Sequence, residues 1–171
     1  MGVKKRQLQT NLRIFGLAFI VLGLWTVIKF VAQTVMDYLP MIREYVKQQG
    51  FAAQADQETA SFWMQFGFTV FVVVLCVLIF LLHFYIGRSA MKDARGHKKN
   101  HVYLVVAILY FIFSIATYVY SFLSPDLGWQ AVLADIFIDL TLYICILAIV
   151  ILSLKLKKLR EAEIAEAGAA A

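Results

Sequence analysis

Basic residues flank four long apolar runs of this chain, and they do so on alternate sides. Of the 16 Lys and Arg residues, 13 lie before the first run, between the second and third, or after the fourth: Lys4, Lys5, Arg6 and Arg13; Arg88, Lys92, Arg95, Lys98 and Lys99; Lys155, Lys157, Lys158 and Arg160. Basic segments resist translocation across a membrane. The pattern therefore predicts four transmembrane helices with the N- and C-termini both in the cytoplasm.

Length and composition agree with a single membrane domain. The chain has 171 residues, of which 62% are hydrophobic, and a mean hydropathy of +0.78, which is too apolar for an ordinary soluble domain. A helix needs about 20 residues to cross the hydrocarbon core. We predict an all-α integral membrane protein, a four-transmembrane-helix bundle over residues 1–171. Its spans are expected at about 11–36, 61–86, 102–123 and 130–154, followed by a charged cytoplasmic tail, 155–171.

The first outer loop is expected to contain a short amphipathic helix. Pro40 suits the first turn of a helix, and Gly50 is a plausible end. Between them, apolar residues such as Met41 and Tyr45 share one face, opposite charged residues such as Arg43. This helix could lie in the outer membrane interface or pack on the bundle, and the sequence leaves both open.

The remaining connections are less regular in sequence. We expect Ala52 to Ala60 to be weakly structured, because the segment is polar. The inner loop is long enough for a helical extension through residues 88–94 and a turn at Gly96. The fourth helix is expected to continue into the basic tail.

Charged and polar residues inside the apolar runs form the main candidate site. Lys29 and Gln33 in the first span fall at about the same depth as Asp135 and Asp139 in the fourth, with Thr69 and Tyr118 slightly shallower. A charge facing lipid at mid-span costs about 2.5–3.5 kcal/mol, so Lys29 should meet a carboxylate. The sequence predicts an intramembrane polar cluster, which could clamp helices, dock a partner, handle a proton or cation, or line an aqueous vestibule.

Two further sets of residues are candidates for contacts with protons or lipids. His83, one turn from the inner boundary of its span, is either an interfacial hydrogen-bonding group or a proton relay. Contacts with anionic lipid are expected from five basic residues of the inner loop and tail: Arg88, Lys98, Lys99, Lys157 and Lys158. The two cysteines, Cys76 and Cys145, fall mid-span without metal-type spacing, so no metal site is predicted.

No catalytic motif is present, and the sequence predicts neither an enzyme nor a cofactor. The net charge of +5 is explained by basic helix ends, not by nucleic-acid binding. The expected function is that of a non-enzymatic subunit or oligomeric interaction component of a membrane complex. The alternative is a small oligomeric transporter or channel whose Lys29 and Asp cluster handles protons or cations. Membrane lipids, further copies of the chain or other membrane-protein subunits are the expected partners, in a cell membrane of the bacterial cytoplasmic type.

Overall fold

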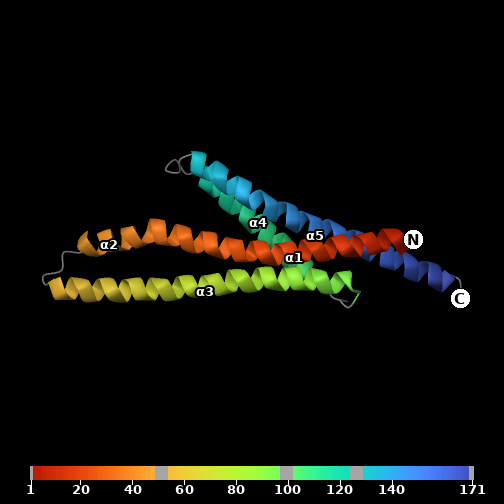
Figure 1. The fold of residues 1–171 in the computed structure, drawn as a ribbon, viewed down its shortest axis with the longest axis horizontal. Helices are drawn as coiled ribbons and strands as arrows, with labels where there is room; N and C mark the ends of the chain where they lie inside the picture. The colour runs from red at the N-terminus through yellow and green to blue at the C-terminus, as the bar shows by residue number, and fades with distance from the viewer. Residues whose placement is uncertain (1, 49–53, 97–101, 124–128, 170–171) are drawn as a thin grey trace. The chain divides into compact units, whose positions relative to one another are not determined.

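The described part of the chain is helical except for a turn at Arg95 and Gly96, and it contains no strand. The computed structural model describes residues 2–48, 54–96, 102–123 and 129–169. Its elements are drawn in Figure 1: α1 (Gly2–Gln33), a π-helical turn (Thr34–Tyr38), α2 (Leu39–Gln48), α3 (Gln54–Ala94), α4 (Val102–Leu123) and α5 (Trp129–Ala169). Since α1, the π-helical turn and α2 follow one another without a gap, the chain forms four helical segments in these ranges.

Each predicted span lies within a separate helical segment. The prediction for α4 agrees with the observed bounds, and α5 continues through the basic tail as expected. The other two helices begin before the expected spans, α1 at Gly2 and α3 at Gln54. The segment from Gln54 to Ala60, expected to be weakly structured, is helical. It is rich in Ala, Gln and Glu and lacks Gly and Pro, so its helix propensity outweighs its polarity.

The first helix was expected to end near residue 36, and Pro40 was expected to begin a separate helix. The helix instead widens into a π-helical turn at Thr34–Tyr38 and continues as α2. A proline has no backbone N–H, and its ring pushes against the carbonyl four residues earlier. A π-helical turn immediately before Pro40 accommodates this change within a continuous helix.

The connection after α3 begins as predicted. The helix α3 extends to Ala94, and Gly96 takes the left-handed conformation with φ of +80°. The Gly96 N–H donates to the Asp93 carbonyl (2.9 Å), and the Arg95 N–H donates to the Met91 carbonyl (3.3 Å). A glycine with positive φ just beyond the last turn is a common helix ending.

The chain divides into two compact units. The first unit comprises residues 1–22 and 83–171, and the second comprises residues 23–82, so α1 and α3 contribute to both. The first unit contains nearly all the buried side chains, including Phe19, Ile86, Tyr103 and Ile146. In the second unit, the buried residues among those described are Gly23, Thr34 and Val72.

Two glycines allow close packing in the first unit. A Cβ atom built on Gly87 of α3 would lie 2.4 Å from the Gly16 carbonyl oxygen of α1. One built on Gly16 would lie 2.8 Å from the Gly87 carbonyl oxygen. Small residues at such a crossing let two helix backbones approach closely.

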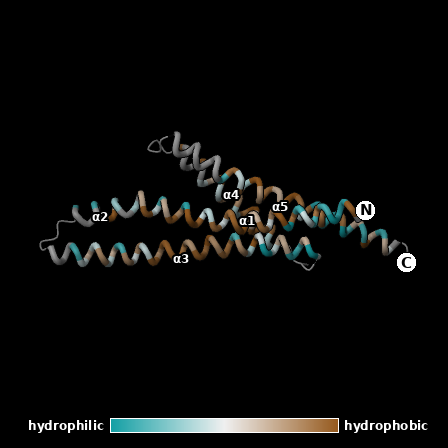
Figure 2. The backbone as a smooth tube through the Cα atoms, in the orientation of Figure 1, coloured by the Kyte–Doolittle hydropathy of each residue, from teal (hydrophilic) through white to brown (hydrophobic). Residues whose placement is uncertain are grey.

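In the described part of the chain, three helices are long and apolar enough to cross a membrane. They cover Val3–Ile42, Glu58–Ala94 and Asp139–Gly168, and a shorter apolar helix covers Val102–Thr117. Their middle parts are largely hydrophobic, and hydrophilic residues gather near the N-terminus and at the ends of α3 and α5 (Figure 2). Large apolar side chains such as Leu109, Phe113 and Phe71 are exposed on them. These properties indicate a membrane-embedded protein.

Candidate functional site

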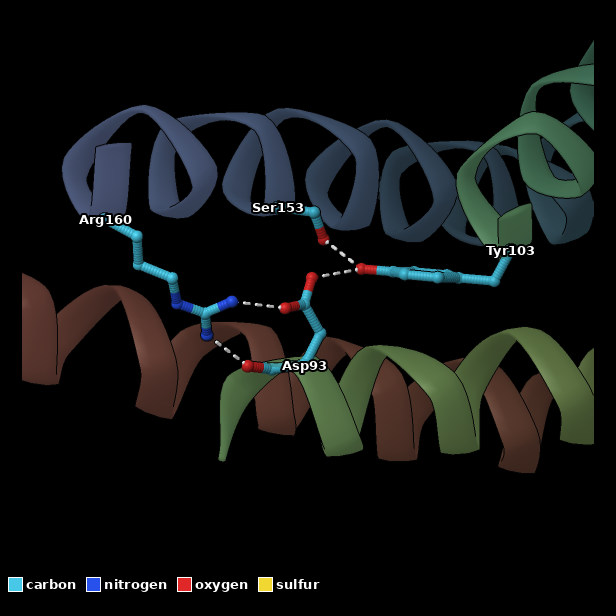
Figure 3. Close-up of polar contacts among 4 residues, drawn as sticks. All are labelled: Asp93, Tyr103, Ser153 and Arg160. Carbon is cyan, nitrogen blue, oxygen red and sulfur yellow. Dashed lines mark hydrogen bonds and ion pairs between the residues drawn. The ribbon is translucent and has the colours of Figure 1, made fainter. Parts of the chain in front are cut away.

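A buried carboxylate, Asp93, is the centre of a polar network in the first unit. Its Oδ1 atom accepts a hydrogen bond from Arg160 Nη1 at 2.7 Å, and its Oδ2 atom accepts one from the Tyr103 hydroxyl at 2.6 Å. The Tyr103 hydroxyl also lies 2.8 Å from Ser153 Oγ. Figure 3 shows the carboxylate between the Arg160 guanidinium and the Tyr103 phenol. We call Asp93, Tyr103, Ser153 and Arg160 the Asp93 network.

Three helices position the Asp93 network. Asp93 lies in the last turn of α3, Tyr103 in the first turn of α4, and Ser153 and Arg160 two turns apart on α5. Arg160 also donates from Nη2 to the Asp93 backbone carbonyl, which belongs to the final turn of α3. Carbonyls there lack a partner within the helix. Arg160 therefore both neutralises the carboxylate and caps the helix that carries it.

The network is almost closed to solvent. Asp93, Tyr103 and Ser153 are 0% exposed, and the Arg160 side chain is 23% exposed. Removing a carboxylate from water is costly unless it is paired and hydrogen-bonded. Both oxygens of Asp93 have such partners. This geometry fits a clamp that holds α3, α4 and α5 together.

A second ion pair connects α1 to the same unit. Lys5 near the start of α1 pairs with Glu163 near the end of α5, and both side chains are partly buried. Lys157 and Glu161, at 3.7 Å, form an exposed pair one helical turn apart on α5, of a kind that contributes little to stability. The Asp93 network joins α3, α4 and α5, and the Lys5–Glu163 pair joins α1 to α5. Together these contacts link the parts of all four helices that belong to the first unit.

A chain of protonatable groups lies deeper in the first unit. His83 of α3 is buried, stacks on Phe19 with ring centroids 4.8 Å apart, and lies 3.2 Å from the Tyr110 hydroxyl through its Nε2 atom. Ser114 of α4 lies near the hydroxyl groups of both Tyr110 and Tyr143. Asp139, one turn before Tyr143 on α5, is an electrostatic neighbour of both phenols. We call His83, Tyr110, Ser114, Tyr143 and Asp139 the His83 chain.

The predicted intramembrane cluster is divided between the two units. Lys29, Gln33 and Thr69 belong to the second unit and Asp139 to the first. The side chains of Asp135 and Tyr118 lie outside the described residues. Lys29 is half-buried and Gln33 is exposed, while the Thr69 hydroxyl donates to the Gln65 carbonyl at 2.7 Å. The meeting of Lys29 with a carboxylate stays a prediction.

The predicted lipid contacts are only partly described. Arg88, Lys157 and Lys158 are exposed, and Lys98 and Lys99 lie outside the described residues. The Arg88 guanidinium carbon lies 5.6 Å from the centre of the Phe84 ring, within the range of a cation–π contact. The remaining predicted site residue, His83, lies within hydrogen-bonding distance of the Tyr110 hydroxyl.

Sequence reasoning missed the Asp93 network. Asp93 is the single acidic residue in the basic segment 87–101, and it continues the buried stripe of His83, Ile86 and Ala90 in steps of three or four residues. This combination of a lone carboxylate and an apolar helical phase was the available signal. Arg160, in contrast, resembles the other basic residues of the tail.

The described residues contain no group of three or more His, Cys, Asp or Glu side chains arranged to hold a metal ion. Cys76 and Cys145 are both free thiols in this part of the chain. Comparisons with protein-family models, curated proteins and solved structures give no match for the chain.

Proposed function

We propose that this protein is a non-enzymatic, multi-pass protein of the cell membrane that acts as a subunit or oligomeric interaction component. In this proposal both termini are cytoplasmic, and α2 lies at the outer interface. The basic residues at the start of α1, the end of α3 and the end of α5 support this orientation. The Asp93 network and the Lys5–Glu163 pair would then stabilise the cytoplasmic end of the bundle.

The sparse core of the second unit carries the proposal. Its described residues bury only Gly23, Thr34 and Val72, and large apolar side chains such as Trp25 and Phe71 are exposed. Lipid can cover apolar side chains, but it offers no hydrogen bonds to polar ones. A unit that buries so few of its described side chains has little core of its own, which favours packing against another protein chain in the membrane.

Neutralising the intramembrane charges is expected to weaken assembly. In mild detergent, the wild-type protein should have the mass of a discrete oligomer or of a complex with another membrane protein, measured by light scattering after size exclusion. Lys29→Met and Asp139→Asn should each raise the dissociation constant at least about ten-fold, as expected when one charge of a buried pair is lost. Lys4→Met, which removes an exposed cation from the same helix, should leave the mass distribution unchanged. A wild-type monomer in both detergent and lipid nanodiscs, with no co-purifying protein, would contradict assembly.

The His83 chain favours a second candidate function, the transfer of protons. His83 of α3 contacts the Tyr110 hydroxyl of α4 at 3.2 Å. Ser114 of α4 lies near the hydroxyls of both Tyr110 and Tyr143, and Tyr143 belongs to α5. Hydroxyl and imidazole groups both donate and accept protons. Asp139 near one end and His83 at the other could exchange a proton through the intervening hydroxyls.

Under this second function, Tyr110→Phe is expected to abolish proton flux into liposomes loaded with a pH-sensitive dye. Phenylalanine keeps the ring that packs beside Phe19 and His83 but removes the hydroxyl between His83 and Ser114. Tyr85→Phe is the matched control, because that phenol is exposed on α3 and should not affect flux. Equal flux in wild-type and Tyr110→Phe liposomes would exclude this path, as would wild-type flux no faster than that of protein-free liposomes.

A further inference from the structure

An open groove follows the last three turns of α3, at the end of its candidate span. It has a volume of about 250 Å³ and is lined by Phe84, Arg88, Met91, Lys92 and Arg95. Phe84, Arg88, Met91 and Arg95 follow one another at steps of three or four residues, and Lys92 is adjacent to Met91, so the five lie on one side of the helix and of the turn that follows it. All of them belong to the first unit. We call these five residues the α3 groove.

Three positive charges of the α3 groove have no acidic partner. Arg88, Lys92 and Arg95 are exposed, and none of them makes an ion pair with a residue that the structure describes. Two partly buried basic residues of the same unit do have acidic partners, since Arg160 pairs with Asp93 and Lys5 pairs with Glu163. Like charges three or four residues apart on a helix repel each other. A bound anion would relieve this repulsion.

The groove also has an apolar part that a free anion would not use. Phe84 and Met91 contribute its apolar lining, and the Arg88 guanidinium lies over the Phe84 ring. Phe84 precedes the end of the predicted span and Arg95 follows the end of α3. The lining is apolar at Phe84 and mostly basic from Arg88 to Arg95, with Met91 among the basic residues. A phospholipid likewise has an acyl chain at one end and a charged headgroup at the other.

We propose that the α3 groove binds an anionic phospholipid of the cytoplasmic leaflet, with the phosphate held by Arg88, Lys92 and Arg95 and an acyl chain against Phe84 and Met91. Guanidinium groups match phosphate oxygens with two parallel hydrogen bonds, and an ammonium adds a point charge. The site rests on the proposed membrane insertion and orientation, but not on assembly or proton transfer. Arg88 was one of the five residues predicted to contact anionic lipid. The proposed site adds Lys92 and Arg95, which were not among those five.

The test is native mass spectrometry of the detergent-purified protein titrated with phosphatidylglycerol. Neutralising each contact should weaken binding about five-fold, so the variant Arg88→Gln/Lys92→Gln/Arg95→Gln should bind about 100-fold more weakly than wild type. Lys4→Gln/Arg6→Gln/Arg13→Gln, which removes the same charge from exposed side chains of α1, should change binding by less than about two-fold. Lys92→Gln alone supplies the five-fold value should the triple variant fail to fold.

Three outcomes would overturn the proposal. Equal losses in the two triple variants would mean that only net charge matters. Equal binding of phosphatidylcholine would exclude recognition of an anionic lipid. Displacement of the lipid by inorganic phosphate at a similar concentration would identify a free phosphate site instead. Membrane extraction with alkaline carbonate tests insertion separately, so a failure of this site is distinguishable from a failure of the proposed function.

Discussion

Replacing Arg160 with glutamine is expected to lower the free energy of unfolding by about 3–5 kcal/mol, the range for breaking a buried ion pair by removing one partner. The variant leaves Asp93 fully buried without its counter-ion, and it removes one of the two donors to the Asp93 backbone carbonyl, the other being the Gly96 N–H. Lys158→Gln is the matched control. It removes the same charge two residues earlier on the same helix, but from an exposed side chain, and should stay within about 0.5 kcal/mol of wild type. Unfolding by a denaturing detergent in mixed micelles measures both.

A double-mutant cycle separates the ion pair from the rest of the network. Once Asp93→Asn has removed the carboxylate, Arg160→Gln should cost much less than it does in wild type, because no buried charge is left uncompensated. Arg160→Lys should fall between, since it keeps a charge but loses the planar fork that contacts both the carboxylate and the carbonyl of Asp93. Equal costs for Arg160→Gln and Lys158→Gln would show that the Asp93 network does not hold the first unit together.

The helical architecture was predictable because it depends on long apolar runs. An apolar run of sufficient length has few alternatives to a helix once it is removed from water. The helix ends were less predictable, since hydropathy contains no signal for them. The polar stretches before Asn11 and Ser61 are helical because of their residue propensities, and Pro40 is accommodated by a π-helical turn.

The candidate site was harder to predict, for a physical reason. A charged residue inside an apolar run is a candidate site residue because its exposure to lipid costs free energy. This criterion identifies Lys29, Asp135 and Asp139. Asp93 lies in a polar, basic segment, where a charge normally costs nothing. Its burial depends on α4 and α5 packing over the end of α3 and bringing Tyr103, Ser153 and Arg160 to it. Such tertiary contacts between distant segments leave little trace in one sequence.

A single methyl group on Gly87 is expected to disrupt the crossing of α1 and α3 in the first unit. The Cβ atom of Gly87→Ala would lie 2.4 Å from the Gly16 carbonyl oxygen and 2.6 Å from Ile20 Cγ1. Because the nearest atom belongs to the backbone, rotation of a side chain cannot relieve the clash, and the helices must separate. Overpacking of this kind costs about 1–3 kcal/mol and sometimes more. That cost exceeds the gain of up to about 1 kcal/mol that alanine brings to a helix.

The same helix provides a matched control, because Gly67 of α3 has open space where a Cβ atom would be added. Gly67→Ala should therefore be neutral or stabilising, while Gly16→Ala, with its closest contact at 2.8 Å, should be destabilising but less so than Gly87→Ala. Thermal unfolding in one detergent gives the order directly. The close approach of α1 and α3 predicts that Gly87→Ala has the lowest midpoint and Gly67→Ala the highest. If Gly87→Ala instead unfolded at the same temperature as Gly67→Ala, the two backbones could not be as close as this crossing requires.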